Sequence, residues 1–497
     1  MFRTLFAIVV FCLAIESPAF GADAASPTRT LSLEDCVRMS LERNFDVQIQ
    51  LIGPQIGRYG LAGARGGYDP NWSLSFDESF RKSDTRIDPQ FGLPFGGDET
   101  TTEGTTSSIG GILPVTGMNY SLYTRANRRS GNRFFGSQFD STAGINLTQP
   151  LLRNLWIDNT RRAILISRVN LRNAEHILRN TLINTVTSVE KAYYDLIFRT
   201  KNVEVQQMAL DLAEQLLEDN KKRVKVGSMA PLEEKQAESQ VAARKADLIS
   251  AVDRKAAQEN LLKNLLTDDF LVWIDIKIQP SETLVAVEMP FDKQASWRRG
   301  IASRPDLLQL KEDLERQNIT VRYRHNQIFP ALDLKASYQH IGIDSNAGDV
   351  LAETIRGHNP SYSIGAQISI PLGNRGALNS YRQARAEKQQ ALLRLKQMEQ
   401  NVLIEIDNAI RTAQTSYLRV EATRDAREYA EAALEAEQKK LANGASTSFV
   451  VLQLQNDLTA ARSNEISALA DYNKALADVA KAEGSTLEKK KIELASE

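Results

Sequence analysis

The chain has 497 residues, a formal net charge of −1 at pH 7 and a pI near 6.5. This balance gives no reason to expect a nucleic-acid partner. The mean hydropathy is −0.34, and after the N-terminus no segment approaches the ~18 consecutive apolar residues of a membrane helix. A β-barrel is not excluded, because its strands are only half apolar.

The N-terminal 24 residues are predicted to be a secretory signal peptide. They contain a basic Arg3, an apolar run over residues 5–15, and small residues before a cleavage site at Gly21 or Ala24. Of the two cysteines, Cys12 lies in this segment. Cys36 is then the only cysteine of the mature chain, so no intrachain disulfide is expected.

A first structural repeat is predicted over residues 28–268. It begins with a helix, and two strands of alternating apolar and polar residues are each followed, further on, by a long stretch that lacks Pro and Gly. The strands span about 71–80 and 140–149, and the long helices span about 153–226 and 232–266. Apolar residues recur every seven positions in the first long helix, from Leu182 to Val224, which is typical of a coiled coil.

A second repeat is predicted over residues 293–484, after a linker or mixed equatorial segment at 269–292. It has the same order of elements and is followed by a polar tail at 485–497. Its strands span about 331–340 and 361–371, and its helices span about 377–442 and 448–483. Each repeat therefore predicts a long antiparallel helical hairpin with a tight tip that contains a glycine.

Matching residues in the two repeats show where they differ. Pro70 and Pro330 are 260 residues apart, whereas Pro150 and Pro371 are only 221 residues apart. Gly227 and Gly444 are 217 residues apart, so the offset changes little after the strands. The first repeat therefore carries about 39 extra residues between its strands.

The extra residues fall in the segment 81–136, which is rich in Gly, Thr and Ser. It contains a weak hairpin pattern at about 102–114 and 118–128. The weak alternation favours an extracellular excursion. Two further barrel strands per chain remain the alternative.

The predicted strands are about ten residues long, the length that crosses a bilayer at a tilt. Their apolar faces have no other strand-rich layer to pack against, so lipid is the expected partner. Four strands cannot close a membrane barrel, and several chains must share one. The fold class is α+β: a membrane protein with long coiled-coil hairpins, an internal duplication and a transmembrane β-barrel shared between protomers, with four strands per chain or six.

With this pattern of strands and helices, the chain resembles the TolC family of outer-membrane efflux and secretion channels. The resemblance covers nearly the whole mature chain, and its motifs are loose singly but specific in their order and spacing. They are Leu31-Ser-Leu-Glu-Asp-Cys-Val-Arg-Met-Ser-Leu-Glu-Arg-Asn44, Ala302-Ser-Arg-Pro-Asp306, Gln149-Pro150-Leu151-Leu152, Ile370-Pro371-Leu372, Val226-Gly227 and Asn443-Gly444.

The resemblance implies a homotrimer with a twelve-strand barrel in the outer membrane and a long periplasmic tunnel of helices. It also implies a periplasmic adaptor, or membrane fusion protein, at the tunnel tips and an inner-membrane pump behind it. The protein would be the exit duct of a tripartite efflux or type I secretion system. The alternative is a soluble periplasmic coiled-coil scaffold or adaptor, which explains the helices but not the strands.

The resemblance also indicates candidate sites at the tips. The residues expected to contact the adaptor are Arg223, Gly227, Glu233, Lys440 and Gly444. The residues expected at the periplasmic constriction are Leu441, Ser446, Val450 and Gln453. These four replace the tyrosine, arginine and aspartates of some family members, so a carboxylate ring that attracts cations is in doubt here.

The sequence shows no motif for catalysis. It has no Gly-rich phosphate loop and no zinc-type spacing of Cys and His. The four histidines are scattered, at positions 176, 325, 340 and 358. We therefore expect no enzyme activity, no cofactor and no metal site, and the substrate class stays open between drugs, metabolites, metals and proteins.

Overall fold

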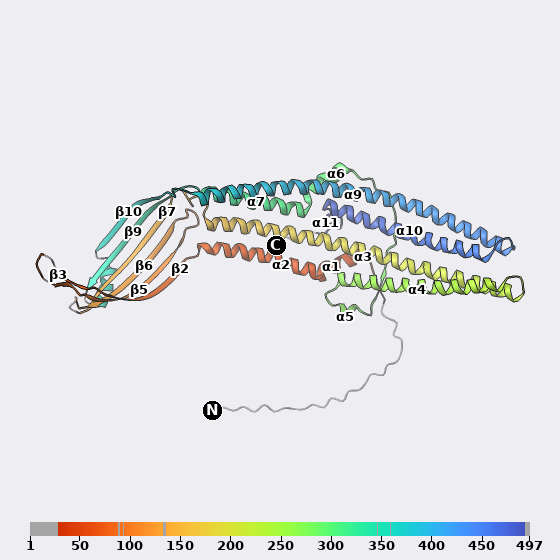
Figure 1. Cartoon of the computed structure of the whole chain (residues 1–497), viewed down its shortest axis with the longest axis horizontal. Coiled ribbons are helices and arrows are strands. Elements are labelled where there is room, and N and C mark those ends of the chain that lie inside the picture. The colour runs from red at the N-terminus through yellow and green to blue at the C-terminus, as the bar shows by residue number, and fades with distance from the viewer. Residues whose placement is uncertain are drawn as a thin grey trace, which may run out of the picture.

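The structure is a computed structural model, and it describes residues 28–492 except 88–89, 93, 133–135, 345 and 358. The predicted signal peptide, His358 and the last five residues of the tail lie outside the described residues. The fold has two parts (Figure 1). A curved sheet forms one end, and long helices extend away from it to the other end.

The sheet has six strands in the order β10-β9-β7-β6-β5-β2, and every neighbouring pair is antiparallel. A two-stranded extension, β3 and β4, follows β2 at the far end of the sheet (Figure 1). The strands are β2 (Asn71–Lys82), β3 (Thr85–Ile87), β4 (Pro94–Gly96), β5 (Glu99–Ile112), β6 (Asn119–Gly131), β7 (Gln138–Pro150), β9 (Ala331–Asp344) and β10 (Pro360–Ser369).

The structure corrects the favoured interpretation of the segment 81–136. Only the part between β2 and β5 extends beyond the six-stranded sheet, whereas β5 and β6 are full members of it. β5 pairs with β2 from Asn71↔Gly110 to Lys82↔Glu99, and β6 pairs with β7 from Asn119↔Thr148 to Arg129↔Gln138. The main sheet of the chain therefore has six strands and not four.

The register places large apolar residues in one row across the sheet. Their shared face is the one that the alternation of β2 and β10 predicts to be apolar. In partner order the row is Trp72, Ile109, Leu122, Ile145, Tyr338 and Tyr362. Trp72 is 61% exposed and Tyr362 is 77% exposed, so a single chain does not bury this face. Lipid is the environment that accommodates such a face.

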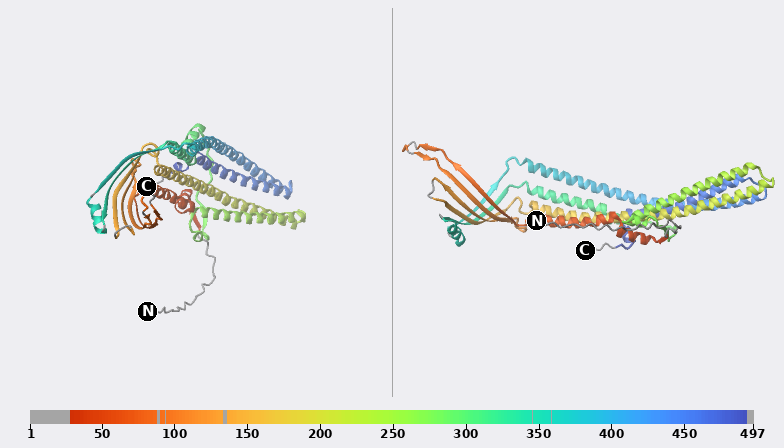
Figure 2. Two further views of the ribbon diagram at one scale, coloured as in Figure 1. Left: turned by 60° about the vertical axis from the view of Figure 1, so that its left-hand side comes forward. Right: turned by 90° about the horizontal axis from the view of Figure 1, so that it is seen from below.

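Two long helical hairpins form the other part of the molecule. The first consists of α3 (Asn159–Lys225) and α4 (Pro231–Leu266), and the second of α9 (Arg375–Ala442) and α10 (Ser448–Glu483). α3 has 67 residues and α9 has 68, which corresponds to about 100 Å each at 1.5 Å per residue. Figure 2 shows both hairpins running together to the end opposite the sheet.

Shorter elements complete each repeat between the sheet and the middle of the helices. The first repeat supplies β1 (Thr28–Leu31), α1 (Leu33–Arg43), α2 (Phe45–Arg65) and η1 (Gly66–Tyr68). The second supplies α6 (Lys293–Ser303) and α7 (Pro305–Asn326), whereas its α8 (Ala347–Arg356) connects β9 to β10 at the far end of the sheet (Figure 2). The segments around them supply α5 (Phe270–Trp273), β8 (Lys277–Pro280), which pairs with β1, and α11 (Thr486–Lys489).

The core follows the predicted heptads of α3. Leu182, Val189 and Leu196 are at most 3% exposed and pack with Cys36 and Leu262. Burying each large aliphatic side chain contributes about 1.5–3 kcal/mol, so this seam is a main source of stability. Val402, Ile406, Ile410 and Ala413 of α9 form the equivalent cluster with α10.

No helix in the described part of the chain combines the length and the apolar character that a membrane crossing requires.

Candidate functional site

The two hairpin tips lie together at the end farthest from the sheet (Figure 1). Gly227 and Gly444 end the long helices with φ of +76° and +74°, in the left-handed region. In both tips the next residue donates a backbone hydrogen bond to the preceding turn: Ser228 to Arg223 and Ala445 to Lys440, each at 2.9 Å. Glycine adopts this conformation without a Cβ clash, which explains its place in both repeats.

Hydrogen bonds join the two tips to each other. The Arg223 guanidinium Nη1 donates to the carbonyl oxygen of Leu441 at 3.0 Å. Asn220, which is 1% exposed, accepts from the Ser448 hydroxyl at 3.0 Å and donates to the carbonyl oxygen of Glu233 at 3.4 Å. A buried polar link thus fixes the register of the first hairpin against the second.

The charged candidates at the tips lie in different surroundings. The Lys440 ammonium pairs with the Glu437 carboxylate at 2.9 Å, and the Ser446 hydroxyl donates to the other oxygen of that carboxylate at 2.5 Å. The Ser446 hydrogen bond and the neighbouring Lys440 charge lower the pKa of Glu437. The Glu233 carboxylate is half-buried at the start of α4, and its Oε2 atom has no hydrogen-bond partner among the described residues.

The four constriction candidates divide into two pairs. Leu441 is 8% exposed and packs against Leu216, Leu434 and Val451, while Ser446 is held by Glu437. Val450 and Gln453 are exposed side chains on α10. The structure therefore brings Leu441 and Ser446 into contacts within the chain and leaves Val450 and Gln453 open to a neighbour or to solvent.

Sequence reasoning missed Asn220, Ser448 and Glu437. One signal was available for Asn220, because it lies three residues after Leu217 in the heptad pattern, at a position where an apolar residue is expected. A polar residue at such a position is a known device for fixing register. Nothing comparable marks Ser448 or Glu437.

Replacing Asn220 with alanine should loosen the tips. The Ser448 hydroxyl and the Glu233 carbonyl would each lose a hydrogen-bond partner at the buried contact between the tips. Leaving a buried polar group unsatisfied costs about 1–3 kcal/mol of stability. Hydrogen exchange at the ends of α3 and α10 should become about tenfold faster or more, since 1.4 kcal/mol corresponds to one factor of ten.

Gln215→Ala is the matched control, because Gln215 is exposed on the same helix. We expect it to leave exchange unchanged. Equal exchange rates in the two variants would show that the Asn220 link does not hold the tips.

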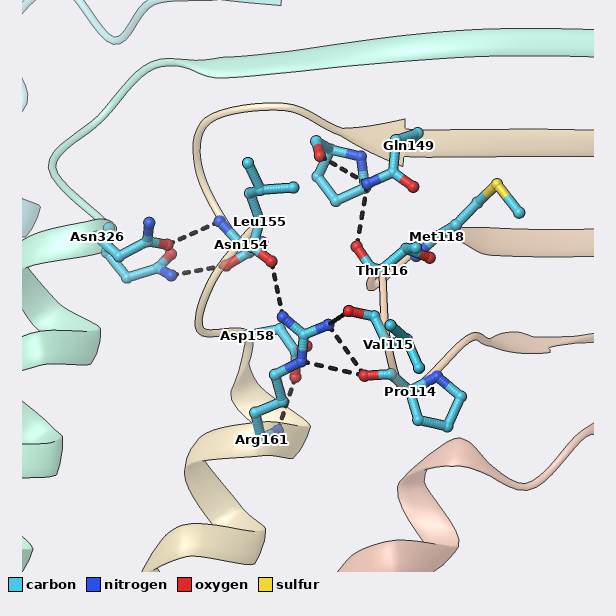
Figure 3. Close-up of polar contacts among 12 residues, drawn as sticks. Pro114, Val115, Thr116, Met118, Gln149, Asn154, Leu155, Asp158, Arg161 and Asn326 are labelled. Carbon is cyan, nitrogen blue, oxygen red and sulfur yellow. Dashed lines mark hydrogen bonds and ion pairs between the residues drawn. The ribbon is translucent and has the colours of Figure 1, made fainter.

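A second polar cluster joins the sheet to the helices (Figure 3). Arg161, in the first turn of α3, donates to the carbonyl oxygens of Leu155 at 2.7 Å, Val115 at 2.7 Å and Pro114 at 3.0 Å. Its Nε atom lies 3.3 Å from the Asp158 carboxylate, which also caps α3. One guanidinium therefore holds the β5–β6 turn against the start of the helix.

The amide groups around this junction complete the connection. Gln149, at the end of β7, donates to the Thr116 carbonyl oxygen at 3.0 Å. The Asn326 side chain accepts from the backbone N–H of Asn154 at 2.7 Å and so links α7 to the loop before α3. The β5–β6 turn is thus tied both to the neighbouring strand and to the helices (Figure 3).

Comparison with known proteins supports the class that this architecture indicates. The family described as outer membrane efflux protein matches residues 112–267 and 298–485. Outer membrane efflux protein BepC of Brucella suis is 25% identical over 325 residues, which cover 64% of this chain and 66% of BepC. Pyoverdine export outer membrane protein OpmQ of Pseudomonas aeruginosa is 24% identical over 45% of each chain. The aligned regions thus span less than two thirds of each of these relatives.

Solved structures show the same fold. The CmeC outer membrane channel of Campylobacter jejuni superposes with a TM-score of 0.67 at 17% identity, over 91% of this chain and 86% of CmeC. VceC of Vibrio cholerae superposes with a TM-score of 0.66 at 17% identity, over 91% of this chain and 96% of VceC.

The chain belongs to the outer membrane efflux protein family. It is therefore an outer-membrane protein of an efflux family, and not an enzyme. The resemblance to the TolC family seen in the sequence is confirmed, as is the combination of helical hairpins with a sheet.

Proposed function

We propose that three copies of this chain assemble into a channel that serves as the exit duct of a tripartite efflux system. The observation that carries the proposal is the six-stranded sheet with an exposed apolar face and two open edges, joined to helices of about 100 Å. Such a sheet satisfies its edges in lipid only by joining further strands. The helices then extend from the outer membrane into the periplasm.

The partner at the tips is a periplasmic adaptor that connects the channel to an inner-membrane pump. Large apolar side chains support this assignment, because Val226, Leu232 and Phe449 at the tips are 78%, 66% and 63% exposed. Side chains of this kind favour contact with another protein. Arg223, Glu233 and Lys440 supply polar contacts beside them, and the pump supplies the energy.

The constriction falls on the same hairpin ends. Val450 and Gln453 are the exposed candidates there, and they bring no carboxylate to the passage. A passage lined by such residues has no strong preference for cations. The family description favours efflux of solutes, and type I secretion of a polypeptide is the competing assignment.

Vesicle leakage tests the channel directly. Full-length protein reconstituted into lipid vesicles should release small polar dyes, whereas vesicles without protein should retain them. Release should not depend on dye charge. A protein that extracts without detergent and leaves the vesicles sealed would contradict the proposal and support a soluble periplasmic scaffold.

A further inference from the structure

We propose that eighteen strands close the barrel of this channel, six from each of three copies, with β2 of one copy paired to β10 of the next. The inference rests on the trimer proposed above and adds the number of strands and the identity of the joining edges. The twelve strands that the family resemblance implies would leave β5 and β6 outside the barrel wall, which the following observations oppose.

The β5–β6 hairpin crosses the full depth of the sheet. β5 stays paired with β2 over the whole length of β2, from Asn71 to Lys82. The β5–β6 turn lies at the end of the sheet that meets the helices, where Arg161 and Gln149 hold its carbonyl groups (Figure 3). An extracellular flap would instead lie beyond the other end of β2 and β7.

Both faces of the hairpin match those of its neighbours. Ile109 and Leu122 continue the apolar row between Trp72 of β2 and Ile145 of β7. On the opposite face, Ser108 and Tyr123 lie in a polar row that runs from Ser73 to Gly144, Gln339 and Ser361. The Tyr123 hydroxyl donates to Gln339 at 2.6 Å within that row. At this level of the sheet the hairpin thus has one apolar face and one polar face.

The two open edges are complementary. β2 runs away from the helices and β10 runs back toward them, so β10 of one copy meets β2 of the next in antiparallel orientation (Figure 1). β2 has 12 residues and β10 has 10, so the edges nearly match in length. Each backbone group left unpaired in lipid is costly, and a second copy of this chain supplies partners along nearly the whole edge.

The extra strands enlarge the passage. Barrel diameter grows roughly linearly with strand number, so eighteen strands give a diameter about 1.5 times that of twelve and a cross-section roughly twice as large. Barrels of this strand number leave an aqueous channel. The outer-membrane segment is then wider than a twelve-strand duct, and size selection is left to the helical tips.

Cysteine labelling in vesicles tests the position of β5. Ser107 and Ser108 are adjacent and face opposite sides of the strand. We expect Ser108→Cys to react with a membrane-impermeant maleimide and Ser107→Cys to react at least tenfold more slowly. The wild-type chain is the background control, because Cys36 is fully buried and burial raises the pKa of its thiol to about 12. Equal reaction at Ser107→Cys and Ser108→Cys would overturn the eighteen-strand barrel.

Deletion of Glu99–Gly131 tests whether β5 and β6 belong to the barrel wall, because it should narrow the passage. The remaining strands β2 and β7 would become neighbours, and the single-channel conductance should fall to about half, in line with the smaller cross-section. An unchanged conductance would place the hairpin outside the wall. If the deleted chain does not insert, the labelling result on the full chain decides.

Cross-linking tests the joining edges. If Asn71 of β2 in one copy pairs with Ser369 of β10 in the next, then Ser79 pairs with Ser361. If the register is shifted by two residues, Ser79 pairs with Ser363. Ser79→Cys combined with Ser361→Cys or Ser363→Cys should therefore give disulfide-linked trimers in one of the two pairings. If the particle has the mass of three chains but neither cross-link forms, the pairing of β2 with β10 is contradicted and the trimer is not. A particle that does not contain three chains would contradict the proposed function itself.

Discussion

Replacing both Gly227 and Gly444 with valine should cut export about tenfold or more while the barrel still inserts. Both positions have φ near +75°, and a β-branched residue there costs about 1–2 kcal/mol of backbone strain per site. Apart from the two chain neighbours, no residue has an atom within 4 Å of a Cβ added at either glycine, so the strain comes from the local backbone. It acts at the tips, far from the sheet. Export and outer-membrane content are measured in the same cells.

The control is the pair Gly227→Asn and Gly444→Asn. Asparagine tolerates the left-handed conformation at a helix end better than valine does. Export should therefore stay within a fewfold of the wild type. Normal export by the valine variant, at normal abundance, would show that the tip conformation does not matter for coupling to the adaptor.

Replacing Arg161 with methionine should destabilise the connection between sheet and helices by about 2–4 kcal/mol. The carbonyl groups of Pro114, Val115 and Leu155 would lose a charged donor, and Asp158 would lose its ion pair. Methionine retains most of the side-chain length, so the effect reports the lost hydrogen bonds. The measurement is the temperature at which detergent-solubilised protein loses its β-sheet signal.

Arg168→Met is the matched control on the same helix. Arg168 is exposed and forms no hydrogen bond or ion pair within the described part of the chain. Its replacement should therefore leave the melting temperature unchanged within about one degree, as for most surface substitutions. If the Arg161 variant has the same melting temperature as the wild type, the hydrogen bonds of Arg161 do not stabilise the connection between sheet and helices.

The outer strands of the sheet were predictable because their apolar and polar residues alternate strictly. Trp72, Leu74 and Phe76 have the period of a strand that is covered on one face, and Ile364 and Ile368 repeat the pattern in β10. The long helices were equally clear, because six heptads without Pro or Gly permit few other structures. β7 and α3 differ from the expected bounds only at their ends, since residues 151–158 form a loop capped by Asp158.

β5 and β6 were not assigned to the barrel because their composition hides the alternation. β5 is rich in Thr, Ser and Gly, and β6 contains Arg125, Arg128 and Arg129. The register places Arg125 beside Thr106 on the polar face, with a hydrogen bond of 3.2 Å. It pairs Arg128 with Glu103 at 3.4 Å on the other face, toward the end of the sheet that lies away from the helices. Such pairing is set by neighbouring strands and is not visible along one strand.

The tip residues were located by the resemblance, but their contacts were not. The glycines follow from the end of each heptad pattern, whereas the bond from Arg223 to the Leu441 carbonyl joins residues 218 positions apart. Leu441 illustrates the same limit, because its packing against Leu216 depends on how the two hairpins lie together. A contact between repeats follows from the fold and not from local sequence.

The most direct test of the account is the mass of the detergent-extracted full chain, corrected for bound detergent. We predict a particle of three chains that forms only in detergent or lipid. A water-soluble monomer would contradict it, because the exposed apolar row from Trp72 to Tyr362 would then have to be covered within one chain.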